Sequence, residues 1–225
     1  MFSNSRPTGA PPLRRRKMLG LFIGLVGMAV GSAADAASSA LPPLMPEQEE
    51  ISAALEGLPP HLREQAGVFV LRAKGYERVR DSRNDFNCVL IREWAKSFES
   101  QCYDAEGTAT ILPVVLLSTE LLAKGASEAE IDAAVAARYA SGEFRAPQRV
   151  GITYMLSNRN IVVMDRKTKR VGPAPPHLMF YSPYAKPEDF GTNDHFDSHF
   201  GVADAGTPRA MIIVPVDLHQ EAHQH

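Results

Sequence analysis

The sequence is poor in the residues that mark several large classes of protein. Among its 225 residues there are only two Cys and one Trp, and 24 Lys+Arg nearly balance 26 Asp+Glu. Two cysteines are too few for a disulfide-dense miniprotein. Hydrophobic residues at 44% and charged residues at 22% are ordinary for a globular chain, and they exclude collagen, a coiled coil and intrinsic disorder. The length fits one domain, or at most two small ones.

Familiar catalytic motifs are also missing. The chain contains no Gly-x-Ser-x-Gly elbow, no Ser-x-x-Lys, no Walker loop, no dinucleotide fingerprint and no Cys-x-x-Cys pair. Each of these motifs holds a nucleophile, a phosphate cradle or a redox dithiol in a fixed local geometry. Their absence argues against a hydrolase, a nucleotide-binding enzyme and a thioredoxin-like protein without excluding the first two, and we predict no cofactor.

What the N-terminus does have is the layout of an export signal. Five basic residues precede an uncharged run, 18–34, and small residues follow it up to Ala36. This order is typical of a signal peptide, so we predict that residues 1–36 are removed after Ala36. The apolar centre, LGLFIGLVGMAV, is shorter than the ~20 residues of a membrane-spanning helix. An uncleaved anchor remains an alternative, and the Arg15-Arg16 pair leaves twin-arginine export open.

Removal of this segment makes the remaining chain acidic. Residues 37–225 contain 19 Lys+Arg and 25 Asp+Glu, a net charge of −6. Such a chain has no electrostatic reason to bind nucleic acid. Its longest apolar run, 111–117, is far too short to span a bilayer. We therefore predict a periplasmic or secreted protein that binds a small molecule or an envelope component. It would contact a membrane only through residues 1–36, if these are retained.

The rest of the chain divides into a leader with a short helix, 37–64, and a single domain, 65–225. In the first part, apolar residues at helical spacing predict a helix over 47–58, which ends at a Pro-Pro pair. β-Branched and aromatic residues then predict three strands, over residues 67–72, 76–80 and 86–92. The third is ambiguous, because 86–98 also has apolar residues at helical spacing.

Two helices are the clearest prediction from local pattern. Pro113 suits the first turn of a helix that Gly125 would end. Ser127 and Glu130 have the spacing of a capping box, which begins a second helix that ends at Gly142. The connection between the two is short and contains Gly, so we expect the helices to form an αα-hairpin.

Strand patterns return after residue 147. Apolar runs predict strands over 152–156, 161–164, 177–181 and 210–214. Strands, then helices, then strands is the order of an α+β fold, and the lack of alternating βαβ units argues against a doubly wound sheet. We predict a mainly antiparallel sheet of about five to seven strands with the αα-hairpin packed on one side.

Cys88 and Cys102 form an even pair in a chain that we expect to be exported. We favour a disulfide between them. It would close a loop of about 15 residues, which contributes roughly 3 kcal/mol in the chain-entropy model. The alternative makes the Cys88 thiolate a nucleophile with His177 as its base. The small flanking residues that would let a substrate approach such a nucleophile are missing around Cys88.

Two carboxylates and a histidine are the other candidate catalytic groups. Asp104 and Glu106 lie two residues apart, just before a predicted helix, and either could act as a general acid or base if burial raised its pKa. Acids before a helix also complement its dipole, which is the simpler explanation. His177 opens an apolar strand. It could act as a base, or it could be a partly buried side chain whose hydrogen bonds are satisfied.

A histidine-containing segment near the C-terminus is a candidate metal site. His195 and His199 are four residues apart in the string Asp194-His-Phe-Asp-Ser-His199, a spacing that suits zinc on a helix. The segment lacks the His-Glu-x-x-His order and lies in a predicted loop. We therefore expect solvated side chains there rather than metal ligands.

Five short strings become distinctive when they are taken together: Phe86-Asn-Cys-Val-Leu90, Cys102-Tyr-Asp-Ala-Glu-Gly-Thr-Ala-Thr110, Tyr154-Met-Leu-Ser157, Pro176-His-Leu-Met-Phe-Tyr181 and Pro208-Arg-Ala-Met-Ile-Ile-Val-Pro215. Over about residues 65–217 the chain resembles an uncharacterised family of exported bacterial proteins. The resemblance implies a bacterial source, export and a single domain. No activity is assigned to that family, so no catalytic role is implied.

These observations lead to two functional hypotheses. The first is an exported protein that acts as a non-catalytic binding or envelope-associated domain. The second is a hydrolase that acts on cell-envelope material, with His177, Asp104 and Glu106, or Cys88, at its site. The two differ in geometry, because an enzyme needs these groups to converge in one concave pocket. In a binding protein they can be scattered.

Overall fold

The structure, a computed structural model, describes residues 41–92, 96–191 and 201–217. The predicted signal peptide, 1–36, lies outside these ranges, and so do the candidate metal ligands His195 and His199. All of the elements below belong to one unit, Ala37–His225. None of the helices in the described ranges combines the length and the hydropathy that a membrane span requires.

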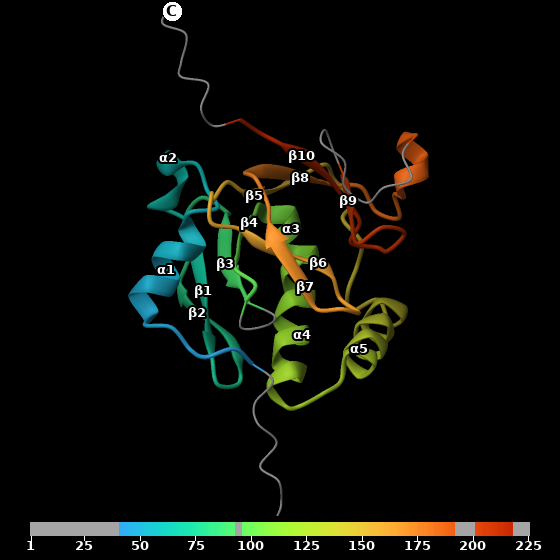
Figure 1. Cartoon of the computed structure of the whole chain (residues 1–225), viewed down its shortest axis with the longest axis horizontal. Helices are drawn as coiled ribbons and strands as arrows, with labels where there is room; N and C mark the ends of the chain where they lie inside the picture. The colour runs from blue at the N-terminus through green and yellow to red at the C-terminus, as the bar shows by residue number, and fades with distance from the viewer. Residues whose placement is uncertain (1–40, 93–95, 192–200, 218–225) are drawn as a thin grey trace, which may run out of the picture. The chain divides into compact units, whose positions relative to one another are not determined.

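Eight strands form one mixed sheet (Figure 1). They are β1 (Gly67–Arg72), β2 (Gly75–Arg80), β3 (Asn87–Ile91), β4 (Glu99–Tyr103), β5 (Ile152–Met155), β8 (His177–Tyr181), β9 (Gly201–Ala203) and β10 (Met211–Pro215). Their spatial order is β2-β1-β3-β4-β5-β8-β10-β9. Neighbouring strands are antiparallel, except that β1 and β3 run parallel.

A separate two-stranded sheet is formed by the hairpin of β6 (Ile161–Asp165) and β7 (Arg170–Pro173). An antiparallel bridge between Phe98 and Ile161 joins it to the segment that precedes β4. The two residues exchange two backbone hydrogen bonds of 2.8 Å. The base of the hairpin, where Ile161 pairs with Pro173, is therefore fixed to the rest of the fold.

Five α-helices and one 3-10 helix complete the described elements. They are α1 (Glu47–Leu55), α2 (Pro60–Arg63), α3 (Ala105–Thr110), α4 (Leu112–Ala123), α5 (Glu128–Ala140) and η1 (Pro187–Phe190). Helix α1 packs against β1, β3 and β4, whereas α3 contacts β4 and β5, and α4 contacts β2.

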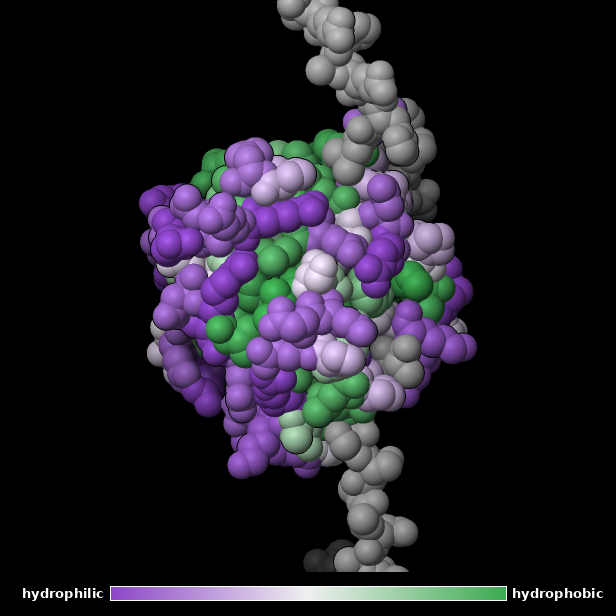
Figure 2. Space-filling model, turned by 90° about the vertical axis from the view of Figure 1, so that its left-hand side faces the viewer, coloured by the Kyte–Doolittle hydropathy of each residue, from purple (hydrophilic) through white to green (hydrophobic). Residues whose placement is uncertain are grey.

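The large sheet separates two apolar cores, because successive residues of a strand point to opposite faces. On the face of α1, the buried residues Cys88, Leu90 and Cys102 pack with alanines of the helix. On the other face, Val89 and Tyr103 pack with residues at the start of α4. Figure 2 shows the side of the protein that carries α1 and α2, where apolar residues gather in the middle and hydrophilic residues surround them.

The α+β class is confirmed, but the prediction of five to seven strands is wrong, because the described residues alone form ten strands in two sheets. The sequence pattern does not predict β4, β7 or β9. Strands β4 and β7 mix polar and apolar residues, and β9 has only three residues, so neither alternation nor β-propensity identifies them. The ambiguous segment 86–98 forms a strand over Asn87–Ile91.

The two helices expected between the strand regions form as α4 and α5, and they contact each other. The capping box is present, since Ser127 N donates to Glu130 Oε2 and Glu130 N donates to Ser127 Oγ. An αα-hairpin packed as a unit on the sheet is not confirmed, because α4 contacts β2 while α5 buries none of its residues. The sequence of α5 is rich in Ala, which offers little apolar area for burial.

Candidate functional site

The two cysteines are joined by a disulfide across β3 and β4. Cys88 and Cys102 are direct partners in the antiparallel register of these strands, and both are fully buried. The predicted disulfide is therefore confirmed. In this form Cys88 has no thiol, so the alternative in which it acts as a nucleophile has no support in the structure.

Asp104 caps a helix and accepts a set of partly buried hydrogen bonds. It is the N-cap residue of α3, and its Oδ1 accepts from Gly107 N at 2.9 Å and from the Tyr181 hydroxyl at 3.0 Å. Its Oδ2 accepts from Ile152 N at 2.9 Å. A Cβ added to Gly107 would lie 2.0 Å from the Tyr181 hydroxyl. The carboxylate thus joins α3, β5 and β8 at one point, which is a structural role.

Glu106 is buried at the first turn of α3, but its carboxylate is fully engaged. It accepts hydrogen bonds from Arg145 Nη1 at 2.7 Å, Gln148 N at 2.8 Å and Arg149 Nε at 3.3 Å. These contacts, and the Arg145 hydrogen bond above all, lower the pKa of Glu106 to about 2. A general acid needs a raised pKa, so the environment of Glu106 favours an anchor for the segment that follows α5.

His177 lies at the opposite end of β8 from Tyr181, the residue that contacts Asp104. Its register partners are Met155 on β5 and Pro215 on β10. The side chain is buried, and its Nδ1 donates to the Pro175 carbonyl at 2.7 Å. Burial lowers the pKa of His177, so the neutral form is favoured. The histidine is therefore a satisfied buried side chain.

The candidate residues do not converge. Tyr181, which binds Asp104, is four residues along β8 from His177, and this corresponds to about 13 Å along a strand. The disulfide packs in the core on the α1 face, whereas Met179 and Tyr181, which alternate with His177 on the same side of β8, belong to the core on the other face. The arrangement that the hydrolase hypothesis requires is therefore absent among these four residues.

A concave site does exist, and it lies at the junction of the two sheets. The pocket has a volume of about 600 Å³, within the usual range for small-molecule sites. Its lining residues are Met45, Arg92, Lys96, Ser97, Phe98, Asn158, Arg159, Asn160, Ile161 and Pro173. Three of these described residues are cations and none is a carboxylate. Apolar side chains supply much of the remaining surface.

Arg92 is the buried cation of this pocket. Its side chain is 8% exposed. It donates from Nη1 to the Pro43 carbonyl at 2.6 Å and from Nη2 to Glu50 Oε2 at 3.3 Å. Its Nε has no hydrogen-bond partner within the described structure. A buried donor without a partner costs about 1–3 kcal/mol, so the position of Arg92 is held at some cost to stability.

Glu50 is the buried carboxylate that balances the charge of Arg92. It is buried on α1, and its Oε1 accepts from Leu71 N on β1 at 2.7 Å. Burial raises the pKa of Glu50, while the Leu71 N–H and the Arg92 charge oppose that shift. One carboxylate thus accepts from two donors, the Leu71 N–H and the Arg92 guanidinium.

Arg159, another cation of the pocket, is held in place by an aromatic ring and a carboxylate. Its guanidinium lies 4.6 Å from the centre of the Phe98 ring and donates to Glu56 Oε1 at 2.7 Å. Ser157 Oγ donates to the other oxygen of Glu56, also at 2.7 Å. A stacked and ion-paired arginine loses less entropy when it binds a ligand than a free one does.

The backbone around the pocket is also fixed. Asn160 is buried, and its Oδ1 accepts from Ser100 N at 3.0 Å. Its Nδ2 donates to the Met155 carbonyl at 3.1 Å. Together with the bridge between Phe98 and Ile161, these bonds hold the start of β6 against the start of β4.

Sequence reasoning misses this pocket because its residues come from four separate segments without a motif. The available signal is Arg92, a charge that directly follows the fully buried strand Asn87–Ile91. For metals, the described residues contain no group of three or more His, Cys, Asp or Glu that could hold an ion. His195 and His199, the candidate metal ligands, lie outside the described residues.

Comparisons with protein-family models, curated proteins and solved structures find no match to this chain. The resemblance to an uncharacterised exported family therefore stays a prediction, and function has to be argued from the site itself.

Proposed function

We propose that this chain is an exported, non-catalytic binding protein, and that the pocket at the sheet junction takes a small organic anion. The observation that carries the proposal is the composition of the pocket: Arg92, Lys96 and Arg159 line it with no carboxylate among the described lining residues. Guanidinium groups bind carboxylate and phosphate oxygens by charge-assisted hydrogen bonds.

The ligand should carry an apolar part as well as its charge. Met45, Phe98, Ile161 and Pro173 line the same space, and binding sites for small molecules usually combine an apolar lining with a few polar groups that fix orientation. A volume of about 600 Å³ suits a molecule of metabolite size. We therefore favour an amphipathic monoanion or dianion over an inorganic ion.

Two features support export. The Cys88–Cys102 disulfide is of a kind that persists in oxidising compartments, and the first 36 residues have the layout of a signal peptide. The mass of the protein recovered from the producing cell, measured before and after reduction and alkylation, tests both points. Intact Met1 on protein found in the cytosol would contradict export.

Hexyl phosphate, hexanoate and neutral hexanol are suitable probes for the pocket. We expect calorimetric titration of the purified protein to show binding of both anions and weaker binding of hexanol. Lys96→Gln should weaken the anions about fivefold, the equivalent of roughly 1 kcal/mol for one exposed charge, and leave hexanol unchanged. The substitution is at an exposed position, so folding is retained.

The matched control is Lys74→Gln, an equal charge change in the turn between β1 and β2, outside the pocket. It should leave all three affinities unchanged. Hexanol binding as tightly as hexyl phosphate would refute anion recognition. Equal losses in the two variants would show that net charge, and not the pocket, decides the affinity.

A further inference from the structure

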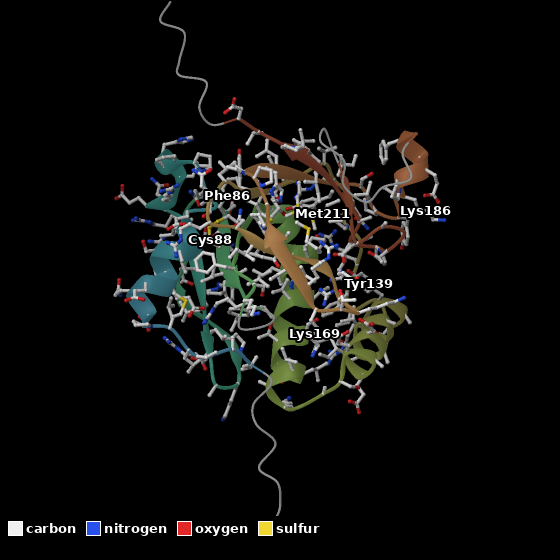
Figure 3. The ribbon with its side chains drawn as sticks, viewed as in Figure 1. Phe86, Cys88, Tyr139, Lys169, Lys186 and Met211 are labelled. Atoms are coloured by element: carbon white, nitrogen blue, oxygen red, sulfur yellow. A yellow bond between two sulfur atoms is a disulfide. The ribbon has the colours of Figure 1, made fainter. Side chains whose placement is uncertain are left out.

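The tip of the β6–β7 hairpin is strongly basic. Arg166, Lys167, Lys169 and Arg170 are four exposed cations within five residues, with Thr168 between them. Residues 37–225 as a whole carry 25 Asp+Glu against 19 Lys+Arg. The tip is thus a local positive region on an acidic chain. Lys169, labelled in Figure 3, marks its position.

The turn that presents these cations is ordered. Asp165 Oδ1 accepts hydrogen bonds from Lys167 N at 2.9 Å and Thr168 N at 3.2 Å. Lys169 then takes a left-handed backbone conformation with φ of 54°. The single acid of the segment is therefore used inside the turn, and a preformed turn loses less entropy on binding than a disordered one.

Apolar side chains lie beside the cations. Met164 is 43% exposed, and it falls where the β6–β7 register shifts between Val163 and Asp165. Its side chain approaches the backbone of Gly172 on β7. The hairpin has no fully buried residue in either strand. Exposed methionine next to a cluster of cations is a combination that suits the interface of a membrane.

We propose that this hairpin tip, residues 164–170, docks the protein on the surface of an anionic phospholipid bilayer. Lipid headgroups attract the cations, and Met164 gains from contact with the acyl boundary, which a soluble polyanion does not provide. The acidity of the remaining chain favours one orientation, with the tip toward the bilayer. The proposal does not depend on the pocket, and it differs from the expectation that only residues 1–36 contact a membrane.

Co-sedimentation of the protein without residues 1–36 tests the proposal, since the signal segment could bind lipid by itself. The vesicles are phosphatidylglycerol mixed with phosphatidylcholine, against phosphatidylcholine alone. We expect binding to the anionic vesicles only, weakening as salt is raised. Lys167→Gln with Arg170→Gln should lower the partition coefficient about 25-fold, because each cation near an anionic surface contributes roughly fivefold.

The matched control is Lys74→Gln with Arg83→Gln, which removes two exposed cations elsewhere. It should lower binding far less than the tip pair. Met164→Ser should weaken binding to vesicles without changing retention on heparin. Equal losses in the tip and control pairs, no binding to anionic vesicles at low salt, or binding to heparin alone would each overturn the proposal. Circular dichroism of each variant shows whether it is folded.

Discussion

A substitution of Glu106 tests whether this residue stabilises the fold or takes part in catalysis. We expect Glu106→Gln to lower the free energy of unfolding by about 2 kcal/mol at neutral pH. The substitution removes a charge that binds Arg145, Arg149 and the Gln148 N–H, and hydrogen bonds to charged groups contribute about 1.5–3 kcal/mol. The Arg145 side chain is 43% exposed. Solvent therefore screens the pair, and the loss stays below the roughly 3–5 kcal/mol of a fully buried pair.

The pH dependence of this loss identifies its cause. The pKa of Glu106 is lowered from 4.5 to about 2, so ionisation stabilises the folded state. This contribution is complete above about pH 4.5 and is lost as the pH falls through about 2. Urea unfolding over that interval should show the difference between wild type and Glu106→Gln shrinking toward zero.

Glu120→Gln is the control for this experiment, because it removes a half-exposed carboxylate of α4 that pairs with Lys124, the residue after the helix. Exposed pairs of this kind contribute little, so its effect should be much smaller. If Glu106→Gln is as stable as wild type at neutral pH, or if its deficit does not change with pH, the anchoring role is wrong.

The disulfide and the close contact at Gly107 give two more measurable losses. Replacing Cys88 and Cys102 together by Ala should cost about 3 kcal/mol of unfolding free energy, because the bond joins residues that are 14 apart in the sequence; an unchanged urea midpoint would contradict this. Gly107→Ala should cost about 1–3 kcal/mol, since its Cβ would lie 2.0 Å from the Tyr181 hydroxyl. Tyr181→Phe should recover part of that loss in the double variant, and no recovery would show that the hydroxyl is not the obstacle.

Local pattern predicts the elements whose stability is local. The run Gly67–Arg72 is almost entirely buried, and its β-branched and aromatic residues identify it without any partner. The capping box at Ser127 and Glu130 is likewise decided within four residues. The order of the strands in the sheet, by contrast, is not predictable from local pattern. The parallel pairing of β1 with β3 skips β2 in sequence, and nothing in either strand indicates it.

The same distinction applies to the candidate sites. The cysteine pair is predictable from the number of cysteines and the predicted compartment alone. The lowering of the Glu106 pKa is not predictable in this way, because it depends on Arg145, which is 39 residues away. From the sequence, an acid at the start of a helix has the same appearance whether it is a proton donor or an anchor. Only the distant partner distinguishes the two.

The pocket lies beyond the end of the β3–β4 ladder, and this position explains its composition. After Ile91 the chain leaves β3, and it returns to a paired geometry at the bridge between Phe98 and Ile161. Backbone groups outside a ladder need other partners when they are buried, and here side chains supply them: Arg92 binds the Pro43 carbonyl, and Asn160 binds Ser100 N and the Met155 carbonyl. Polar residues required by the fold are thus concentrated around one concave space. Arg92 and Arg159 are therefore held in place by the fold itself, and under the proposed function little ordering of these two side chains would remain to oppose the binding of an anion.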